Sequence, residues 1–204
     1  MRIEDVIKRA VVIDNIVDEG KGIVKALDQA DVPTDFIHVK SDGSEDVVTS
    51  YAHPRELIIA DLLLNEKQDE VKTNISRLIG IINKLQPDNA KFYGIVVWTK
   101  HINLTDDFLE RISKAVKLGM EYGEKNEAQE EKDEEEVATV VYLRNPPLFI
   151  LQLDKMRYNK EGEWNFSNLL HDINVELEKS KTAYFSLRWK QKVNEAIDNV
   201  TNQI

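Results

Sequence analysis

Three short apolar runs in the sequence each end at a side chain that can take part in chemistry. Asp14 follows the run AVVI, Asp61 follows LIIA, and Thr99 follows GIVVW. Buried parallel strands deliver side chains in this way to one edge of a sheet. Two carboxylates and a hydroxyl at such an edge would make a small acidic pocket, which can hold a divalent cation and accept a phosphoryl group.

A fourth run, residues 148–153, leads to Lys155. In aspartyl phosphorylation, Asp61 would be the nucleophile and would form an acyl phosphate. Asp14 and Asp61 would hold Mg²⁺, and the Lys155 ammonium would neutralise a phosphoryl oxygen as a point charge. The Thr99 hydroxyl would hydrogen-bond the phosphate once it has formed. A simpler interpretation is that the two carboxylates only cap the N-termini of the helices that follow.

The composition restricts the classes of protein to which the chain can belong. Its 204 residues fit one domain, or one domain with an appendage. A net charge of -10 argues against nucleic acid or an anionic membrane as the main partner. The absence of cysteine excludes disulfides and thiolate metal sites. No apolar stretch reaches the roughly 20 residues that span a bilayer, and the acidic start lacks a signal-peptide core, so we expect a cytoplasmic protein.

Apolar runs alternate with segments of helical period along the chain. This alternation predicts an α/β fold with a doubly wound, five-stranded parallel sheet. The most apolar run, near Asp61, should form a central strand, whereas the alternating segment 35–40 should form an edge strand. The expected strands cover residues 9–14, 35–40, 56–64, 91–100 and 148–153, and the expected helices cover 16–30, 73–85 and a segment that begins at Thr105, with a short helix at most in 41–54.

Two segments depart from this alternation. Residues 121–137 are dominated by Glu, which is typical of a solvated helix extension or a flexible loop, with a docking surface for a basic partner as the alternative. After a turn near Gly162, the chain has helical period to its end. Apolar residues between Trp189 and Ile204 recur at spacings near 3.5, as in a coiled-coil seam. We therefore expect a domain over residues 1–180 and an amphipathic linker or dimerisation helix over 181–204.

The order of the four strand-end residues resembles that of response-regulator receiver domains. In that family, acids follow the first strand, the phosphoacceptor aspartate follows the third, a threonine or serine the fourth and a lysine the fifth. Asp14, Asp61, Thr99 and Lys155 occupy these positions. The resemblance covers about residues 9–177 and implies the CheY-like, flavodoxin-like fold.

The resemblance also implies a function in two-component signalling. Asp61 would accept a phosphoryl group from a histidine kinase or phosphotransfer protein, with Mg²⁺ held by Asp14, Asp61 and the backbone carbonyl of Leu63. Such a domain is a signalling module rather than an enzyme. Its output would pass to an effector domain or protein partner through the C-terminal helix. The tail pattern itself indicates a homodimer as an alternative, and the net charge argues against nucleic acid and membrane partners.

The chain also departs from the family pattern. Asn15 stands where a second acid is usual, which weakens the Mg²⁺ site, and Asp18 or Glu19 could compensate only if the loop folds back. The segment after Asp61 lacks the usual proline and glycine, and Lys100 replaces a small residue. A divergent receiver is therefore one hypothesis. A phosphorylation-independent pseudo-receiver that binds other proteins is the second, and a metal-dependent phosphoester hydrolase is the third.

Overall fold

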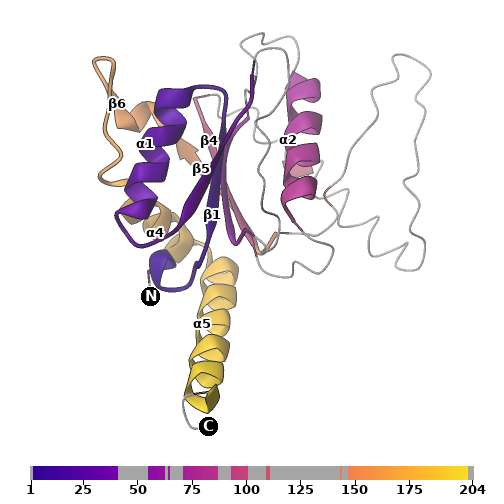
Figure 1. Cartoon of the computed structure of the whole chain (residues 1–204), viewed down its shortest axis with the longest axis vertical. Coiled ribbons are helices and arrows are strands. Elements are labelled where there is room, and N and C mark those ends of the chain that lie inside the picture. Colours follow the sequence, from indigo (N-terminus) through magenta and orange to yellow (C-terminus); the bar gives the residue numbers. More distant parts are fainter. Residues whose placement is uncertain are drawn as a thin grey trace, which may run out of the picture.

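Five parallel strands form the sheet at the centre of the protein (Figure 1). The computed structural model describes residues 2–40, 55–62, 64, 71–86, 93–100, 109–110, 143 and 147–201. The strand order is β2-β1-β3-β4-β5, so the predicted parallel α/β sheet is confirmed. The strands are β1 (Ala10–Asp14), β2 (Thr34–His38), β3 (Leu57–Asp61), β4 (Gly94–Thr99) and β5 (Phe149–Asp154).

The burial of each strand follows its place in the sheet. All residues of β1, β3 and β4 are buried, because these strands have neighbours on both sides. β2 and β5 lie at the two edges and are partly exposed. The predicted central place of the Asp61 strand and the predicted edge place of the segment 35–40 are both confirmed.

Helices cover both faces of the sheet, as the term doubly wound requires. Helix α1 (Val17–Asp28) and helix α4 (Leu169–Lys179) lie on one face, and helix α2 (Val71–Leu85) lies on the other (Figure 1). The α1/α4 face is completed by the short 3-10 helix η1 (Ile3–Asp5). Each face has its own apolar core, because successive strand residues point to opposite sides.

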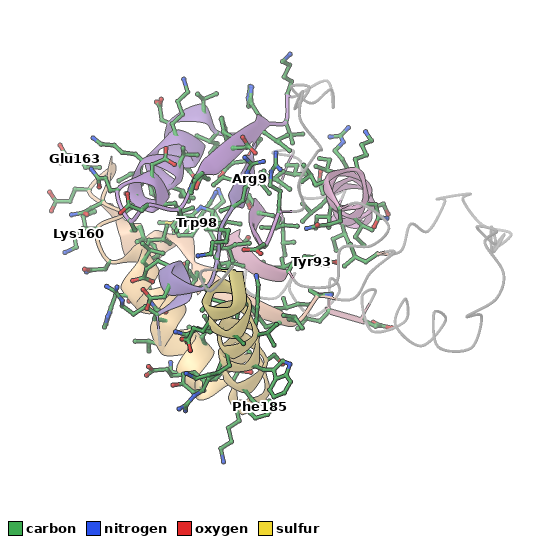
Figure 2. The ribbon with its side chains drawn as sticks, turned by 60° about the horizontal axis from the view of Figure 1, so that its bottom comes forward. Arg9, Tyr93, Trp98, Lys160, Glu163 and Phe185 are labelled. Atoms are coloured by element: carbon green, nitrogen blue, oxygen red, sulfur yellow. The ribbon has the colours of Figure 1, made fainter. Side chains whose placement is uncertain are left out.

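A compact segment, residues 155–168, joins β5 to α4 and is called the excursion below. It contains the 3-10 helix η3 (Lys155–Tyr158) and a two-stranded hairpin, β6 (Asn159–Lys160) and β7 (Glu163–Trp164). Gly162 has a φ of 91° at the hairpin turn, which glycine adopts without steric cost. The sequence predicted the turn but not the hairpin, whose strands are too short to show a period. Figure 2 shows Lys160 and Glu163 at the outside of this excursion.

The C-terminal helix α5 (Lys181–Thr201) extends away from the sheet (Figure 1). It is separated from α4 by Ser180, whose backbone is extended. Ala183 and Leu187 near its start are buried in the α1/α4 core, and Lys190 Nζ forms an ion pair with Glu56 Oε1 at 2.6 Å. The first half of α5 is therefore packed against the rest of the protein.

Several predicted segments lie outside the described residues. These are the short helix within 41–54, most of the helix that begins at Thr105, and the acidic segment 121–137. Within the described ranges, no helix is long and apolar enough to cross a membrane.

Candidate functional site

The carboxyl ends of the central strands bring the predicted site residues to one edge of the sheet. Ile13 of β1 pairs with Ala60 of β3, so that Asp14 and Asp61, the next residue on each strand, lie side by side. Asp61 is itself paired with Trp98 of β4. Thr99 follows Trp98 and pairs with Asp154 of β5. The expected gathering of strand ends at this edge is therefore present in the fold.

Because side chains alternate along each strand, the position of a site residue in its strand decides on which face of the sheet it lies. Val12 and Ile59 belong to the α1/α4 core, and Asp14 and Asp61 lie two residues further along the same strands. Both carboxylates therefore lie on the α1/α4 face of the sheet. Thr99 is fully buried and lies two residues beyond Val97 of the α2 core, so alternation places it on the opposite face.

Lys155 is brought to the carboxylates by the first turn after β5. Asp154 caps η3 by accepting a hydrogen bond from Met156 N, which fixes the backbone where Lys155 leaves the strand. Lys155 Nζ donates a hydrogen bond to Asp61 Oδ2 at 2.6 Å, and both side chains are almost fully buried. The sequence proposed Lys155 and Asp61 as members of one site, and the structure places them in direct contact.

Glu19 is a further member of this group, named from the sequence only as an acid that could compensate for Asn15. Lys155 Nζ also donates a hydrogen bond to Glu19 Oε2 at 2.9 Å, and Glu19 is buried. The sequence indicated that Glu19 could reach the site only if its loop folded back, and that interpretation was wrong. Glu19 lies in the first turn of α1, which begins directly above the sheet edge, so regular helix geometry delivers it. Its position five residues after Asp14 was the available signal.

Asp14 is the most perturbed carboxyl group of the site. It is fully buried, and its Oδ1 accepts a hydrogen bond from Ile16 N at 2.8 Å at the start of α1. Burial, followed by the charge of Asp61, raises the pKa of Asp14 to about 7, although the Ile16 hydrogen bond and Lys155 oppose the shift. Asp14 thus binds the backbone N–H of the residue that precedes α1, while the helix itself has no side-chain cap, and Asp14 also interacts electrostatically with the other site residues.

The Lys155 amine stays charged despite its burial. Desolvation alone would lower its pKa, because the charged form is disfavoured away from water. The charge and hydrogen bond of Asp61, with further contributions from Asp14 and Glu19, outweigh desolvation and raise the pKa. The site therefore combines one cation with three carboxyl groups, an excess of negative character that favours a further cation.

The unpartnered oxygen atoms of the site are of the type that a small hard cation such as Mg²⁺ takes as ligands. Asp14 Oδ2 and Asn15 Oδ1 are buried, and neither has a hydrogen-bond partner within the described residues. Across the same part of the chain, no group of three or more His, Cys, Asp or Glu side chains is arranged as a metal site. Mg²⁺ commonly takes only one or two carboxylates and keeps several waters, so Asp14 and Asp61 suffice in number. The predicted ligand Leu63 lies outside the described residues.

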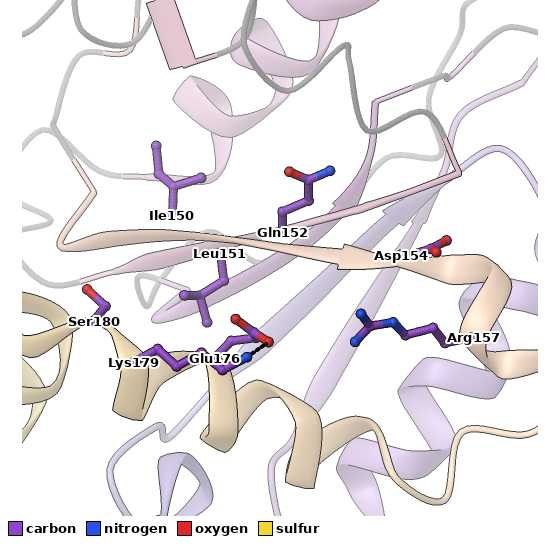
Figure 3. Close-up of a pocket in the computed structure, with 8 residues that line it drawn as sticks. All are labelled: Ile150, Leu151, Gln152, Asp154, Arg157, Glu176, Lys179 and Ser180. Atoms are coloured by element: carbon purple, nitrogen blue, oxygen red, sulfur yellow. Dashed lines mark hydrogen bonds and ion pairs between the residues drawn. The ribbon is translucent and has the colours of Figure 1, made fainter.

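A separate cavity of about 540 Å³ opens between β5 and α4 (Figure 3). Arg157 and Asp154 line it at one end, and Glu176 and Lys179, joined by an ion pair at 2.6 Å, line it on the helix side. Its charges of opposite sign are close to balanced, and Lys155, Asp61 and Asp14 do not line it. This cavity is therefore distinct from the candidate site.

The fold and the site together define a flavodoxin-like α/β domain with a lysine-bridged acidic group at the carboxyl edge of its sheet. Ligands of open α/β sheets bind at this edge. No family model matches the chain, and comparisons with curated proteins and with solved structures give no match.

Proposed function

We propose that the chain is a signalling receiver module in which Asp61 accepts a phosphoryl group. The observation that supports this most directly is the contact of Lys155 Nζ with Asp61 Oδ2 at 2.6 Å, at the edge of the sheet where Asp14 also lies. A nucleophilic carboxylate beside a fixed cation and a second acid suits the transfer of an anionic group. The strand order 2-1-3-4-5 agrees with this class of module.

The proposed reaction transfers a phosphoryl group from a phosphohistidine donor. An Asp61 carboxylate oxygen attacks phosphorus, the phosphorus–nitrogen bond of the donor breaks, and the imidazole leaves with the electron pair and takes up a proton. Lys155 donates to the charge that develops on the phosphoryl oxygens, while Glu19 orients the ammonium from the side of α1. Mg²⁺, when held by Asp14 and Asp61, offsets the negative charge of the incoming group.

Two features could transmit the effect of phosphorylation at Asp61 to other parts of the protein. Thr99 follows Trp98, the strand partner of Asp61, but lies on the opposite face of the sheet, so the end of β4 would have to rearrange for the Thr99 hydroxyl to reach the phosphoryl group. Trp98, that strand partner, packs against Tyr158 and Phe166 of the excursion, with ring centroids 4.8 and 5.7 Å apart. A change at Asp61 would thus be passed to the excursion through a packed aromatic group.

Intact-mass measurement with acetyl phosphate and Mg²⁺ tests the proposal. The wild-type chain should gain the mass of one phosphoryl group, and Asp61→Asn should gain none. Asp154→Asn is a matched control, because Asp154 also ends a strand but lies outside the group bridged by Lys155 and keeps an oxygen for the η3 cap as Asn. Absence of the adduct on the wild type, or its persistence in Asp61→Asn, would refute the assignment.

The closed state of the site supports a second candidate, a pseudo-receiver that binds a protein partner without phosphorylation. Asp14 is 0% exposed and Asp61 is 2% exposed, and Lys155 ties Asp61 to Glu19. In this case the ion pairs would serve only to hold α1 and η3 on the sheet. A folded wild-type chain that gains no mass, and whose melting temperature is unchanged by Mg²⁺, would favour the pseudo-receiver.

A further inference from the structure

Helix α5 carries an exposed apolar stripe on the side that does not pack against its own domain. Phe185, Trp189 and Val193 follow one another at intervals of four residues, which places them along one side of the helix. Phe185 is 68% exposed and Trp189 is 63% exposed, whereas Ala183 and Leu187 on the other side are buried. Figure 2 shows Phe185 on the outside of the molecule. Such a stripe marks an interaction surface.

The charges beside the stripe indicate what covers it. Arg188 and Glu195 are seven residues apart, two turns of helix, and so lie on the same flank of the stripe. Arg188 is exposed and Glu195 is half-buried in the isolated chain. Two helices packed in antiparallel fashion bring equivalent flanks together, so a basic position towards one end faces an acidic position towards the other.

We propose that α5 pairs with α5 of a second copy of this chain in an antiparallel arrangement about a two-fold axis near residue 191, the midpoint of the helix. Trp189 and Val193 lie two residues before and after this midpoint, so Trp189 of each copy packs against Val193 of the other. Arg188 lies within one residue of the level of Glu195 of the other copy. The symmetry repeats both contacts, giving two ion pairs and two Trp–Val contacts.

The same charges argue against the other ways of covering the stripe. A parallel pair in register would bring opposite flanks of the two helices together, so Arg188 of one copy and Glu195 of the other would not meet. An anionic membrane would attract Arg188 and Lys192 but repel Glu195, which forms an ion pair with Lys192 at 2.7 Å. The arrangement does not depend on phosphorylation of Asp61, and it gives the predicted homodimer a definite geometry.

Light scattering of the full-length chain over a range of concentrations tests this proposal. The wild type should show twice the mass of one chain, and Trp189→Glu should show the mass of one chain. Met156→Glu is the matched control, because Met156 is also an exposed large apolar residue but lies away from α5, and it should keep the dimer mass. A wild-type chain that stays monomeric at the highest concentration would overturn the proposal, whether or not anionic vesicles then bind it.

Charge exchange tests the antiparallel geometry. Arg188→Glu alone, or Glu195→Arg alone, places like charges opposite one another at two positions. Each should raise the dissociation constant of the dimer roughly tenfold. The chain with both substitutions restores opposite charges and should dimerise as the wild type does. In a parallel pair Arg188 and Glu195 of the two copies would not meet. Single substitutions with no effect would therefore exclude the antiparallel arrangement. Circular dichroism of each variant should show unchanged helix content.

Discussion

Lys155 of η3 and Glu19 of α1 are 136 residues apart in the chain and lie in contact at 2.9 Å. Since Lys155 also contacts Asp61 at the end of β3, its ammonium joins three elements at the carboxyl edge of the sheet. Desolvation makes such a buried cation costly by itself, and its partners compensate for that cost. The ion pairs thus fix the position of α1 and η3 as well as the group proposed to stabilise a phosphoryl oxygen.

Removal of the Lys155 ammonium should destabilise the protein strongly. Lys155→Met leaves Asp61 and Glu19 buried without their shared cation, and breaking a buried ion pair in this way costs roughly 3–5 kcal/mol. Urea unfolding at pH 7 measures the change. As a control, Lys179→Met removes an ion pair in which Lys179 is 65% exposed, and such exposed pairs contribute less than about 1 kcal/mol. Equal effects of the two substitutions would show that the buried ion pairs contribute little.

The raised pKa of Asp14 should make stability depend on pH. The ordinary pKa is 3.8 and the folded value is about 7. Between these values the unfolded chain releases the Asp14 proton while the folded chain keeps it, so stability falls as pH rises from about 4 to 7 and is constant above. Asp14→Asn removes this dependence and should stabilise the metal-free protein at pH 8, by up to roughly 4 kcal/mol. Urea unfolding with a chelator present, at pH 5 and pH 8, checks this; a variant that is less stable at pH 8 would contradict it.

Helix α5 should contribute to the stability of the domain through only one of its sides. Leu187→Ala creates a cavity in the α1/α4 core and should cost roughly 2–5 kcal/mol. Trp189→Ala, two residues further on, removes an exposed side chain and should cost less than about 0.5 kcal/mol at a concentration where the chain is monomeric. Thermal unfolding of the two variants at low concentration separates them. Similar losses would show that Trp189 also packs within its own chain.

Substitution of two glycines by alanine should change the stability of the protein in opposite directions. A Cβ on Gly94 of β4 would overlap the ring of Phe149 on β5, so Gly94→Ala should destabilise by roughly 1–3 kcal/mol. A Cβ on Gly80 of α2 meets nothing within 4 Å, so Gly80→Ala should stabilise the helix by roughly 0.5–1 kcal/mol. Urea unfolding of both variants checks the pair. A stable Gly94→Ala variant would mean that Phe149 can move aside without loss.

The sequence predicted most of the sheet because its strands are short apolar runs with polar ends. The runs before Asp14, Asp61 and Thr99 became β1, β3 and β4, and the alternating segment 35–40 gave the edge strand β2. The hairpin β6–β7 was missed because two-residue strands carry no pattern. The helical period expected after Gly162 is confirmed by α4 and α5, which meet at Ser180, but Trp164 lies in β7 instead of a helix.

By itself, the sequence determined which side chains stand at the ends of the strands, since burial of a parallel strand requires apolar residues until the strand stops. It therefore supplied Asp14, Asp61, Thr99 and Lys155 as candidates for one site, of which Thr99 lies on the opposite face of the sheet. Only the tertiary structure decided that Lys155 turns back to contact Asp61 and that Glu19 completes the group. The physical reason is that an ion pair depends on where α1 and η3 come to lie over the sheet, and long-range packing sets that position.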